Sequence, residues 1–306
     1  RWLRFLERNG FGGILADDMG LGKTAQTLAH ILLEKQAGRL NGRPVLIVAP
    51  TSLMHNWQQE AAKFTPALSV FLLHGAARHQ AFADTSSHDI VLTTYPLLSR
   101  DEAALLPHRF HQIILDEAQH IKNPHSKAAQ VLRRLPSEHR LCLTGTPMEN
   151  HLGELWSLFH FVMPGFLGSQ ETFNKKYRHP IEKKNDEAQR RHLANRVRPF
   201  VLRRLKTEVT TELPPKTTIE ISIPMNDAQR YEAVRAAMQR NIRQIIAEQG
   251  FKRSQIQILD ALLKLRQVCC HPALLDSDGH DADGKKAAPS AKLEHLVEMV
   301  QNMVAE

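Results

Sequence analysis

The sequence predicts an α/β fold, a mostly parallel sheet flanked by helices, with a helical protrusion added to it. Up to about residue 163, short apolar segments alternate with helical stretches, which is typical of a parallel sheet covered on both faces. After Pro164 the pattern becomes mainly helical and charged. The chain has 306 residues, 42% of them hydrophobic, which is enough for one large domain or two smaller ones. No apolar run approaches the roughly 20 residues that cross a bilayer.

Six apolar segments have the length of buried strands. They are Gly13–Ala16, Val45–Ala49, Val70–Leu73, Asp89–Thr94, Gln112–Leu115 and Arg140–Leu143. The helices predicted between them are Thr24–Gln36, Leu53–Phe64, Ser126–Leu135 and Leu152–Phe161. In such sheets ligands bind at the carboxyl ends of the strands, so we look for function in the loops that follow them.

Beyond residue 165 we expect the helical protrusion, over 166–275. Within it, Lys216–Ile223 alternates like a strand and is predicted to return to the edge of the sheet. Asp227 is predicted to cap a long helix, and a second helix is expected near Ser254–Val268. Residues 276–290 are rich in Gly and Asp, which favours a flexible linker, and helical patterning resumes at Lys292.

Charge is concentrated in one part of the chain. The net charge is +8, and Phe173–Lys206 alone carries twelve Lys or Arg against three acidic residues. This segment is either a solvated helical surface or a face that contacts phosphates, and the sequence leaves both open. The three cysteines, an odd number, argue against a disulfide framework and favour a reducing compartment.

The segment DDMGLGKT, residues 17–24, lies between a predicted strand and a predicted helix. Its glycines let successive backbone N–H groups point at phosphate oxygens at the start of the helix. Lys23 is predicted to reach the outer phosphates and Thr24 to bind Mg²⁺. The strict pattern has glycine where this chain has Asp17. The predicted nucleotide-binding residues are Asp18, Met19, Gly20, Leu21, Gly22, Lys23, Thr24 and Ala25.

The segment QIILDEAQ, residues 112–119, is an apolar strand that ends in two adjacent carboxylates. We expect Asp116 to hold Mg²⁺ and Glu117 to orient or deprotonate the attacking water. A further segment, LTGTPMEN, follows the last predicted strand. Its Thr144, Gly145 and Thr146 either sense the state of the phosphate or form a turn that caps the next helix, and both roles are compatible.

The order of these segments resembles the Snf-type branch (SWI/SNF family) of superfamily-two helicase-like ATPases, with a preference for its prokaryotic members. The matching segments are ILADDMGLGKT, IVAPTSLMHNW, VLTTYPLL, ILDEAQHIKN, LTGTPMENHLGELWSLFHFVMPG, FVLRRLKTEVTTELPPK, LRQVCCHP and SAKLEHLVEMV. The resemblance spans essentially the whole chain. IKN after DEAQ, the LRRLKTEV segment and CCHP are its most specific parts.

The resemblance implies that residues 1–165 are the first ATPase lobe, a P-loop NTPase core, and that 291–306 begin a second lobe. It implies ATP and Mg²⁺ as cofactors and hydrolysis that depends on double-stranded DNA. Gln119 joins Lys23, Asp116 and Glu117 in catalysis, and the residues expected to face the DNA backbone are Thr51, Thr94, Lys122 and Asn123. Contacts to phosphates carry no sequence information, which suits a motor that steps over any sequence. A DNA-bound protein target, no membrane and a monomeric state are expected, in the cytoplasm (on a bacterial nucleoid) or in a eukaryotic nucleus.

Two expected parts of the family pattern are missing. We expect the chain to be an excerpt, because it starts after the glutamine segment that reads adenine and lacks a complete second lobe with its arginine fingers. Arg203 and Arg204 are not those fingers, since in the family they lie at the base of the protrusion. The excerpt alone is therefore expected to be nearly inactive.

Other interpretations compete with these. Cys269, Cys270 and His271 are interpreted as core and helix-end residues rather than a zinc site, because adjacent cysteines cannot easily ligate one ion together. The seventeen histidines lack metal-ligand spacing and are interpreted as mostly surface residues. Trp57, Trp156 and Phe159 are expected in the core. A strand-separating helicase and a nucleotide-gated DNA-binding module with little turnover are the alternative functions.

Overall fold

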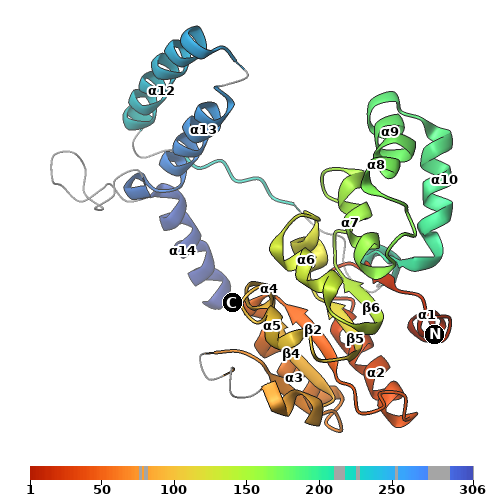
Figure 1. Cartoon of the computed structure of the whole chain (residues 1–306). Helices are drawn as coiled ribbons and strands as arrows, with labels where there is room; N and C mark the ends of the chain where they lie inside the picture. The colour runs from red at the N-terminus through yellow and green to blue at the C-terminus, as the bar shows by residue number, and fades with distance from the viewer. Residues whose placement is uncertain are drawn as a thin grey trace. The chain divides into compact units, whose positions relative to one another are not determined.

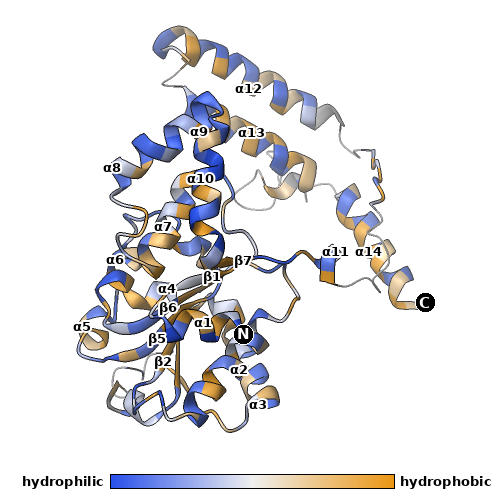
Figure 2. Cartoon of the chain, turned by 90° about the vertical axis from the view of Figure 1, so that its right-hand side faces the viewer, coloured by the Kyte–Doolittle hydropathy of each residue, from blue (hydrophilic) through white to orange (hydrophobic). Residues whose placement is uncertain are grey.

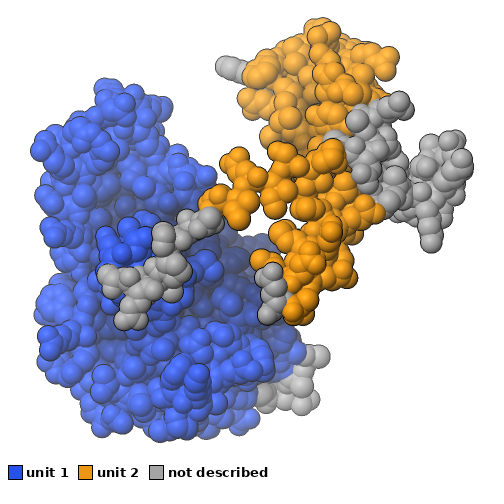
Figure 3. All heavy atoms as spheres, turned by 180° about the vertical axis from the view of Figure 1, so that it is seen from behind, with its two compact units in different colours: residues 1–214 blue, residues 215–306 orange. Residues whose placement is uncertain are grey.

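The structure is a computed structural model that describes residues 1–75, 78, 82–209, 218–224, 228–251, 254–274 and 290–305. The chain forms two compact units, residues 1–214 and 215–306, which Figure 3 colours separately. Asp227 and residues 276–289, for which a cap and a linker were predicted, lie outside the described residues.

The first unit is built on a seven-stranded sheet with the order β3-β4-β2-β5-β6-β1-β7, and its neighbouring strands run parallel. The strands are β1 (Gly13–Leu15), β2 (Val45–Ala49), β3 (Val70–Leu72), β4 (Ile90–Thr94), β5 (Phe110–Leu115), β6 (Ser137–Leu143) and β7 (Val201–Leu202). The register pairs Val48 with Leu115 and Leu115 with Cys142, so the central strands end level with one another. The predicted parallel sheet is confirmed, and its loops after the strands share one edge.

Helices cover both faces of this sheet (Figure 1). One face is covered by α2 (Lys23–Gln36) and α3 (Met54–Phe64), with α1 (Trp2–Arg8) beside them. The other is covered by α4 (Tyr95–Leu98), α5 (Glu102–Leu105), α6 (Lys127–Arg134) and α7 (Leu152–Val162). On β2, Leu46 and Val48 pack toward α4–α7, whereas Val45 and Ile47 pack toward α2 and α3. Because both faces are buried, β2 is a continuous apolar run, and β5 and β6 become apolar toward their carboxyl ends, at Ile113–Leu115 and Leu141–Leu143.

A group of mainly short helices continues from α7 within the same compact unit. Its members are α8 (Gln170–Phe173), η5 (Asn174–Arg178), α9 (His179–Lys184), α10 (Glu187–Val197) and η6 (Arg198–Phe200). Phe173, Tyr177 and Leu193 are buried in the core cluster that also contains Trp156 and Phe159. Of the predicted protrusion, 166–275, these first helices therefore pack on the helical layer of the sheet, whereas residues from 215 onward belong to the second unit.

The strand that returns to the sheet is not the predicted one. Val201 and Leu202 of β7 pair with Ile14 and Leu15 of β1, and α11 (Lys206–Val209) follows. Within the predicted strand Lys216–Ile223, the described residues from 218 onward have no regular secondary structure. The prediction failed because alternation needs a neighbouring strand, and Val201–Leu202 already occupies the edge beside β1.

The second unit is helical, with α12 (Ala228–Gln249), α13 (Gln255–Cys270), η7 (Pro272–Leu274) and α14 (Ala291–Ala305). Ala261 and Val268 of α13 are buried. Ser290 accepts a hydrogen bond from the Leu293 amide at 3.3 Å, and its hydroxyl donates to the Cys270 carbonyl at 2.5 Å, which ties α14 to the end of α13. Among the described residues, no helix is long and apolar enough to span a membrane.

Candidate functional site

The phosphate loop connects β1 to α2 at the carboxyl-end edge of the sheet. Gly20 and Gly22 have φ values of 85° and 69°, a left-handed backbone that favours glycine. Lys23 is the first residue of α2, and its ammonium donates hydrogen bonds to the carbonyls of Asp17 at 2.7 Å and Asp18 at 3.3 Å. The positive charge thus lies inside the loop, at a helix N-terminus that favours anions.

Asp17, the residue that departs from the glycine pattern, is fully buried. Its carboxylate accepts hydrogen bonds from the Arg204 backbone amide at 3.0 Å and from Arg204 Nε at 3.1 Å, and the two side chains form an ion pair. Arg204 also donates to Gln26 Oε1 at 2.7 Å. The segment after β7 therefore fixes the phosphate loop from 187 residues away. The sequence analysis did not predict that Arg204 binds Asp17. An acidic residue at a glycine position, in a chain that also has the arginine pair Arg203 and Arg204, was the available signal.

Asp116 follows β5, and 7% of it is exposed. One carboxylate oxygen accepts a hydrogen bond from Trp57 Nε1 at 2.8 Å, and the other accepts one from the Glu117 amide at 2.9 Å. Burial raises the pKa of the Asp116 carboxyl above its ordinary value, and the charge of Glu117 raises it further. Nearby cations lower the pKa of such a group. Trp57 is in the core as predicted, and it also orients the acid, which the sequence did not indicate.

Glu117 has φ 49° and ψ 55°, an uncommon backbone for a residue with a long side chain. The other non-glycine residues at positive φ among the described residues are both asparagines, Asn41 and Asn185, which tolerate it better. This backbone turns Glu117 away from the direction of the strand. Its carboxylate accepts a hydrogen bond from Gln119 Nε2 at 2.9 Å, in the short helix η4 (Ala118–Ile121).

A path of hydrogen bonds leads from this carboxylate to the loop after β6. The Thr144 hydroxyl donates to Gln119 Oε1 at 3.1 Å and accepts from the Thr146 amide at 3.1 Å. Gly145 lies against the phosphate loop, because a Cβ added there would be 3.3 Å from Met19 Cγ. The loop after β6 thus lies against the phosphate loop and is joined to Glu117 through Gln119, so a displacement of the phosphate loop or of Glu117 can be passed to it.

The four residues expected to face DNA differ in exposure. Thr51 in η1 (Thr51–Leu53) and Asn123 are exposed, whereas 1% of Thr94 is exposed. The Thr94 side chain is therefore not presented to a partner at this surface. Lys122 forms an ion pair with Glu149 at 2.8 Å, and Thr146 donates to the other Glu149 oxygen at 3.1 Å.

The basic segment also offers free surface. Lys183, Lys184, Arg190 and Arg191 are all exposed, and Figure 2 shows α9 largely in the hydrophilic colour. Arg190 pairs with Glu187 within its own helix. The exposure is compatible with both interpretations of this segment.

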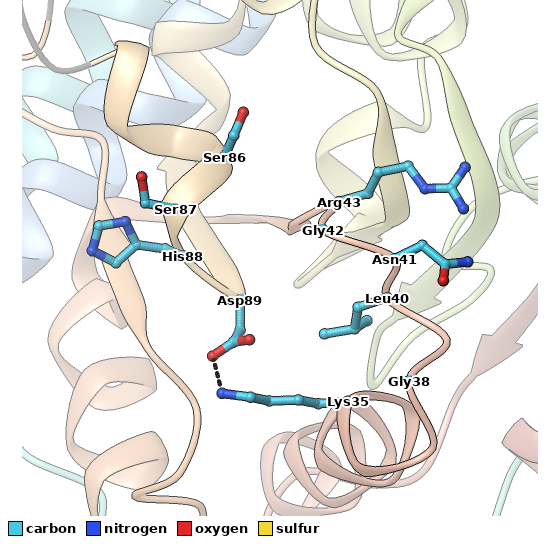
Figure 4. A pocket seen from close by; sticks show the side chains of 10 residues that line it. All are labelled: Lys35, Gly38, Leu40, Asn41, Gly42, Arg43, Ser86, Ser87, His88 and Asp89. Atoms are coloured by element: carbon cyan, nitrogen blue, oxygen red, sulfur yellow. Dashed lines mark hydrogen bonds and ion pairs between the residues drawn. The ribbon is translucent and has the colours of Figure 1, made fainter.

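A hollow of about 370 Å³ lies elsewhere, between the end of α2 and the segment before β4 (Figure 4). Lys35 and Asp89 point toward one another across it, 2.8 Å apart. Asp89 also accepts hydrogen bonds from the amide and hydroxyl of Ser69 at 2.7 and 2.8 Å. Because Lys35 is already paired with Asp89, this hollow offers no unpaired positive charge at that point for a phosphate.

The donor set at the carboxyl-end edge does fit a phosphate group with a divalent cation. It combines the Lys23 ammonium, the half-buried Thr24 hydroxyl at the start of α2 and the Asp116 carboxylate. Burial raises the pKa of Asp116, and the charge of Lys23 acts in the opposite direction, as a bound cation would. Oxygen ligands of this kind suit Mg²⁺.

Comparison with known proteins agrees with this geometry. The profile of the SNF2-related domain matches residues 1–274. YwqA of Bacillus subtilis (strain 168), whose name proposes an ATP-dependent helicase/translocase, is 42% identical over 311 residues, 100% of this chain and 33% of that protein. The ISWI chromatin-remodeling complex ATPase ISW1 of Saccharomyces cerevisiae is 32% identical over 301 residues, 97% of this chain and 26% of that protein.

A solved structure is similar as well. The Sulfolobus solfataricus SWI2/SNF2 ATPase core in complex with dsDNA matches with a TM-score of 0.65 and 35% identity, over 99% of this chain and 62% of that chain. The chain spans about a third or less of the two curated relatives. The sequence profile, the relatives and the parallel sheet with its loops agree, and the chain belongs to the SNF2-related family.

Proposed function

We propose that this chain is the nucleotide-binding lobe of an ATP-dependent translocase on double-stranded DNA. The observation that carries the proposal is the chain of hydrogen bonds from Glu117 through Gln119 to Thr144, in a loop whose Gly145 lies against Met19 of the phosphate loop. A motor needs its hydrolytic site coupled to a part that moves, and these hydrogen bonds supply a physical route for that coupling. The relatives' names and the DNA in the similar structure support the same function.

In this proposal the phosphate loop binds the triphosphate of ATP through Lys23 and the backbone of residues 18–25. Thr24 and Asp116 would hold Mg²⁺, which would neutralise charge on the phosphate oxygens. Glu117 orients the attacking water and accepts its proton, and Gln119 holds the Glu117 carboxylate in place. Trp57 keeps the Asp116 carboxylate oriented through its hydrogen bond.

The proposed DNA surface begins at the same edge of the sheet. Thr51 and Asn123 are exposed there, and Lys122 becomes available if its ion pair with Glu149 opens. Contacts of this kind to phosphates would be independent of sequence. Because the chain matches only part of its relatives, we propose that robust turnover needs a second lobe, whose arginines are worth on the order of 10³–10⁵ in rate in related phosphoryl-transfer enzymes.

One comparison tests the function. The ATPase rate of the full-length protein is measured with double-stranded DNA, single-stranded DNA and RNA, and strand displacement is measured on a forked duplex. We expect stimulation by the duplex without displacement. Displacement would favour a strand-separating helicase, and nucleotide-dependent DNA binding without turnover would favour a gated binding module.

For residues 1–306 alone we expect weak ATP binding and negligible turnover, even with DNA. Robust DNA-stimulated hydrolysis by this chain alone would contradict the need for a second lobe.

A further inference from the structure

A second cluster of chemically active side chains lies at the opposite edge of the sheet. It consists of Glu7 on α1, His30 and Glu34 on α2, His111 near the start of β5 and His139 near the start of β6. The side chains of Glu7, His30, His111 and Glu34 are only 8%, 3%, 3% and 2% exposed. The phosphate loop and the acidic pair follow the carboxyl ends of the strands, so this cluster is a separate site.

Three of these residues form a set of metal-ligand type. The ligand atoms of Glu7, His111 and His139 lie within 4.8 Å of one another. His111 Nε2 is 2.9 Å from Glu7 Oε1, and the imidazoles of His111 and His139 meet edge to face at 5.3 Å between ring centres. Two imidazoles and one carboxylate are a donor set that suits zinc and similar divalent transition metals.

The surroundings of these ligands also match a metal site. His111 Nδ1, the nitrogen that faces away from Glu7, is 3.5 Å from a carboxylate oxygen of Glu138. On the other side, His30 Nε2 is 3.4 Å from Glu7 Oε2. Ligating histidines typically turn their second nitrogen toward a carboxylate. Glu138 faces His111 in this way, at an ion-pair distance rather than in a hydrogen bond.

Hydrogen bonds within the cluster leave several buried imidazole nitrogens without a partner in the part of the chain that the structure describes. Both ring nitrogens of His30 and the Nδ1 atoms of His111 and His139 are buried without a hydrogen bond among the described residues. Buried polar atoms are nearly always paired, so several unpaired imidazole nitrogens in one place call for a specific explanation. A cation held by Glu7, His111 and His139 gives one nitrogen of each of these two imidazoles a partner, whereas the nitrogens of His30 lie outside this triad.

A second triad shares Glu7 but suits an ion less well. Glu7, His30 and Glu34 also approach one another. Both Glu34 oxygens, however, accept hydrogen bonds from the Arg39 guanidinium, one of them at 2.6 Å. The charge of Glu34 is therefore already compensated, which leaves it less available to an ion than the Glu7 carboxylate beside the imidazoles.

We propose that Glu7, His111 and His139 bind one divalent transition-metal ion of the zinc class. The ion fastens α1 to the starts of β5 and β6, with a fourth position open to water. Its ligands come from three elements that only the folded chain brings together, so the ion binds the folded state and stabilises it. The proposal is independent of ATP hydrolysis, because the site lies at the other edge of the sheet.

The test uses the 306-residue chain after treatment with a chelator and removal of the chelator. Calorimetric titration with zinc chloride is expected to show one site per chain, and thermal unfolding is expected to shift upward with zinc. Glu7→Gln keeps the shape of the side chain and removes the anionic ligand. Because both residues are proposed as direct ligands, we expect Glu7→Gln and His139→Ala each to weaken zinc binding by more than the roughly 10-fold that loss of an outer-shell partner can cost.

Two control variants separate this site from others. His55→Ala removes an exposed histidine, and a double Cys269→Ser, Cys270→Ser variant removes the thiols at the end of α13. Both are expected to keep the zinc affinity of the parent chain. Circular dichroism of each variant establishes that it is folded before titration. The proposal fails if the parent chain binds no zinc, or if Glu7→Gln and His139→Ala, both folded, bind it as the parent does. Loss of binding in the cysteine variant alone would move the site to α13.

Discussion

At the carboxyl-end edge of the sheet the phosphate loop and the loop after β6 reach the surface although Asp116 and Thr144 are buried, whereas at the amino-end edge Glu7, His30 and Glu34 are enclosed. Met19 in the phosphate loop is 70% exposed and Thr146 is exposed, but the His30 side chain is 3% exposed. The carboxyl-end edge also carries an unfavourable backbone at Glu117, with φ 49°.

The difference shows that one sheet can carry a site for reversible binding at one edge and a permanently buried polar cluster at the other. A site that binds and releases a nucleotide needs access and a few side chains held in position by the fold. A buried polar cluster must instead be satisfied permanently, by partners or by an ion, because burial without partners is costly. Substitutions at the carboxyl-end edge should therefore change activity more than stability, and single variants can break or sharpen that contrast.

The largest effect is expected for Glu117→Gln in the full-length protein. The amide keeps the shape of the side chain but cannot accept a proton, so turnover should fall by about 10³-fold. Binding of ATP and Mg²⁺ should persist, whereas Lys23→Ala should weaken nucleotide binding itself. Steady-state ATPase rates and fluorescent-nucleotide titration measure the two effects. Wild-type turnover by Glu117→Gln would refute its assigned role.

Arg204→Ala should be an exception to the contrast, since it acts on stability at the functional edge. It leaves the fully buried Asp17 without its cation, and because the Arg204 side chain is 40% exposed the expected cost is about 2 kcal/mol, less than for a fully buried pair. Nucleotide affinity should fall as well, because Asp17 positions the loop. Urea unfolding of the chain measures the stability. Arg203→Ala is the matched control, exposed and expected within about 0.5 kcal/mol of the parent; equal effects of both would remove the proposed role of Arg204.

Glu117→Gly should raise stability while abolishing turnover. Glycine adopts a left-handed backbone without the cost of about 1 kcal/mol that glutamate has there. Removing the carboxylate also relieves its repulsion with Asp116. The free energy of unfolding of the chain should therefore rise by up to about 1 kcal/mol, measured by urea denaturation. A less stable Glu117→Gly chain would mean that this edge stores no backbone strain.

The smallest effect is expected away from both edges, on the basic helices. Replacing Lys183, Lys184, Arg190 and Arg191 by Ala should lower the slope of log affinity against log salt by about 1 for each DNA phosphate that these side chains neutralise. Filter binding of duplex DNA at several salt concentrations measures the slope. A control variant with the exposed Arg4, Lys63, Arg100 and Arg109 replaced removes equal charge elsewhere. Equal slopes in both variants would favour a solvated surface.

The sequence predicted the parallel sheet because its signal is local. A strand buried on both faces must be apolar at nearly every position, as in Val45–Ala49, and the glycines of the phosphate loop are required by its backbone. The candidate residues Lys23, Asp116 and Glu117 were found for the same reason, since each directly follows or precedes a recognisable strand or helix. Which strands pair with one another was harder to predict. Strand β7 was missed because its two residues carry too little pattern to predict a strand.

The exposure and the partners of single side chains could not be predicted from the sequence either. Thr94 is the last residue of β4 and was expected at the DNA surface, yet it is 1% exposed. Trp57 was recognised as a core residue, but its hydrogen bond to Asp116 joins residues 59 positions apart.

The sequence by itself determined the sheet, its covering helices, the phosphate loop and the acidic pair, because those features depend on neighbours within one strand, turn or helix. The tertiary structure alone decided the partner of Asp17 and the cluster around Glu7. Arg204 lies 187 positions from Asp17, and His111 lies 104 positions from Glu7. No local pattern records contacts of that separation, since they form only where the parallel strands bring the ends of distant segments to one edge of the sheet.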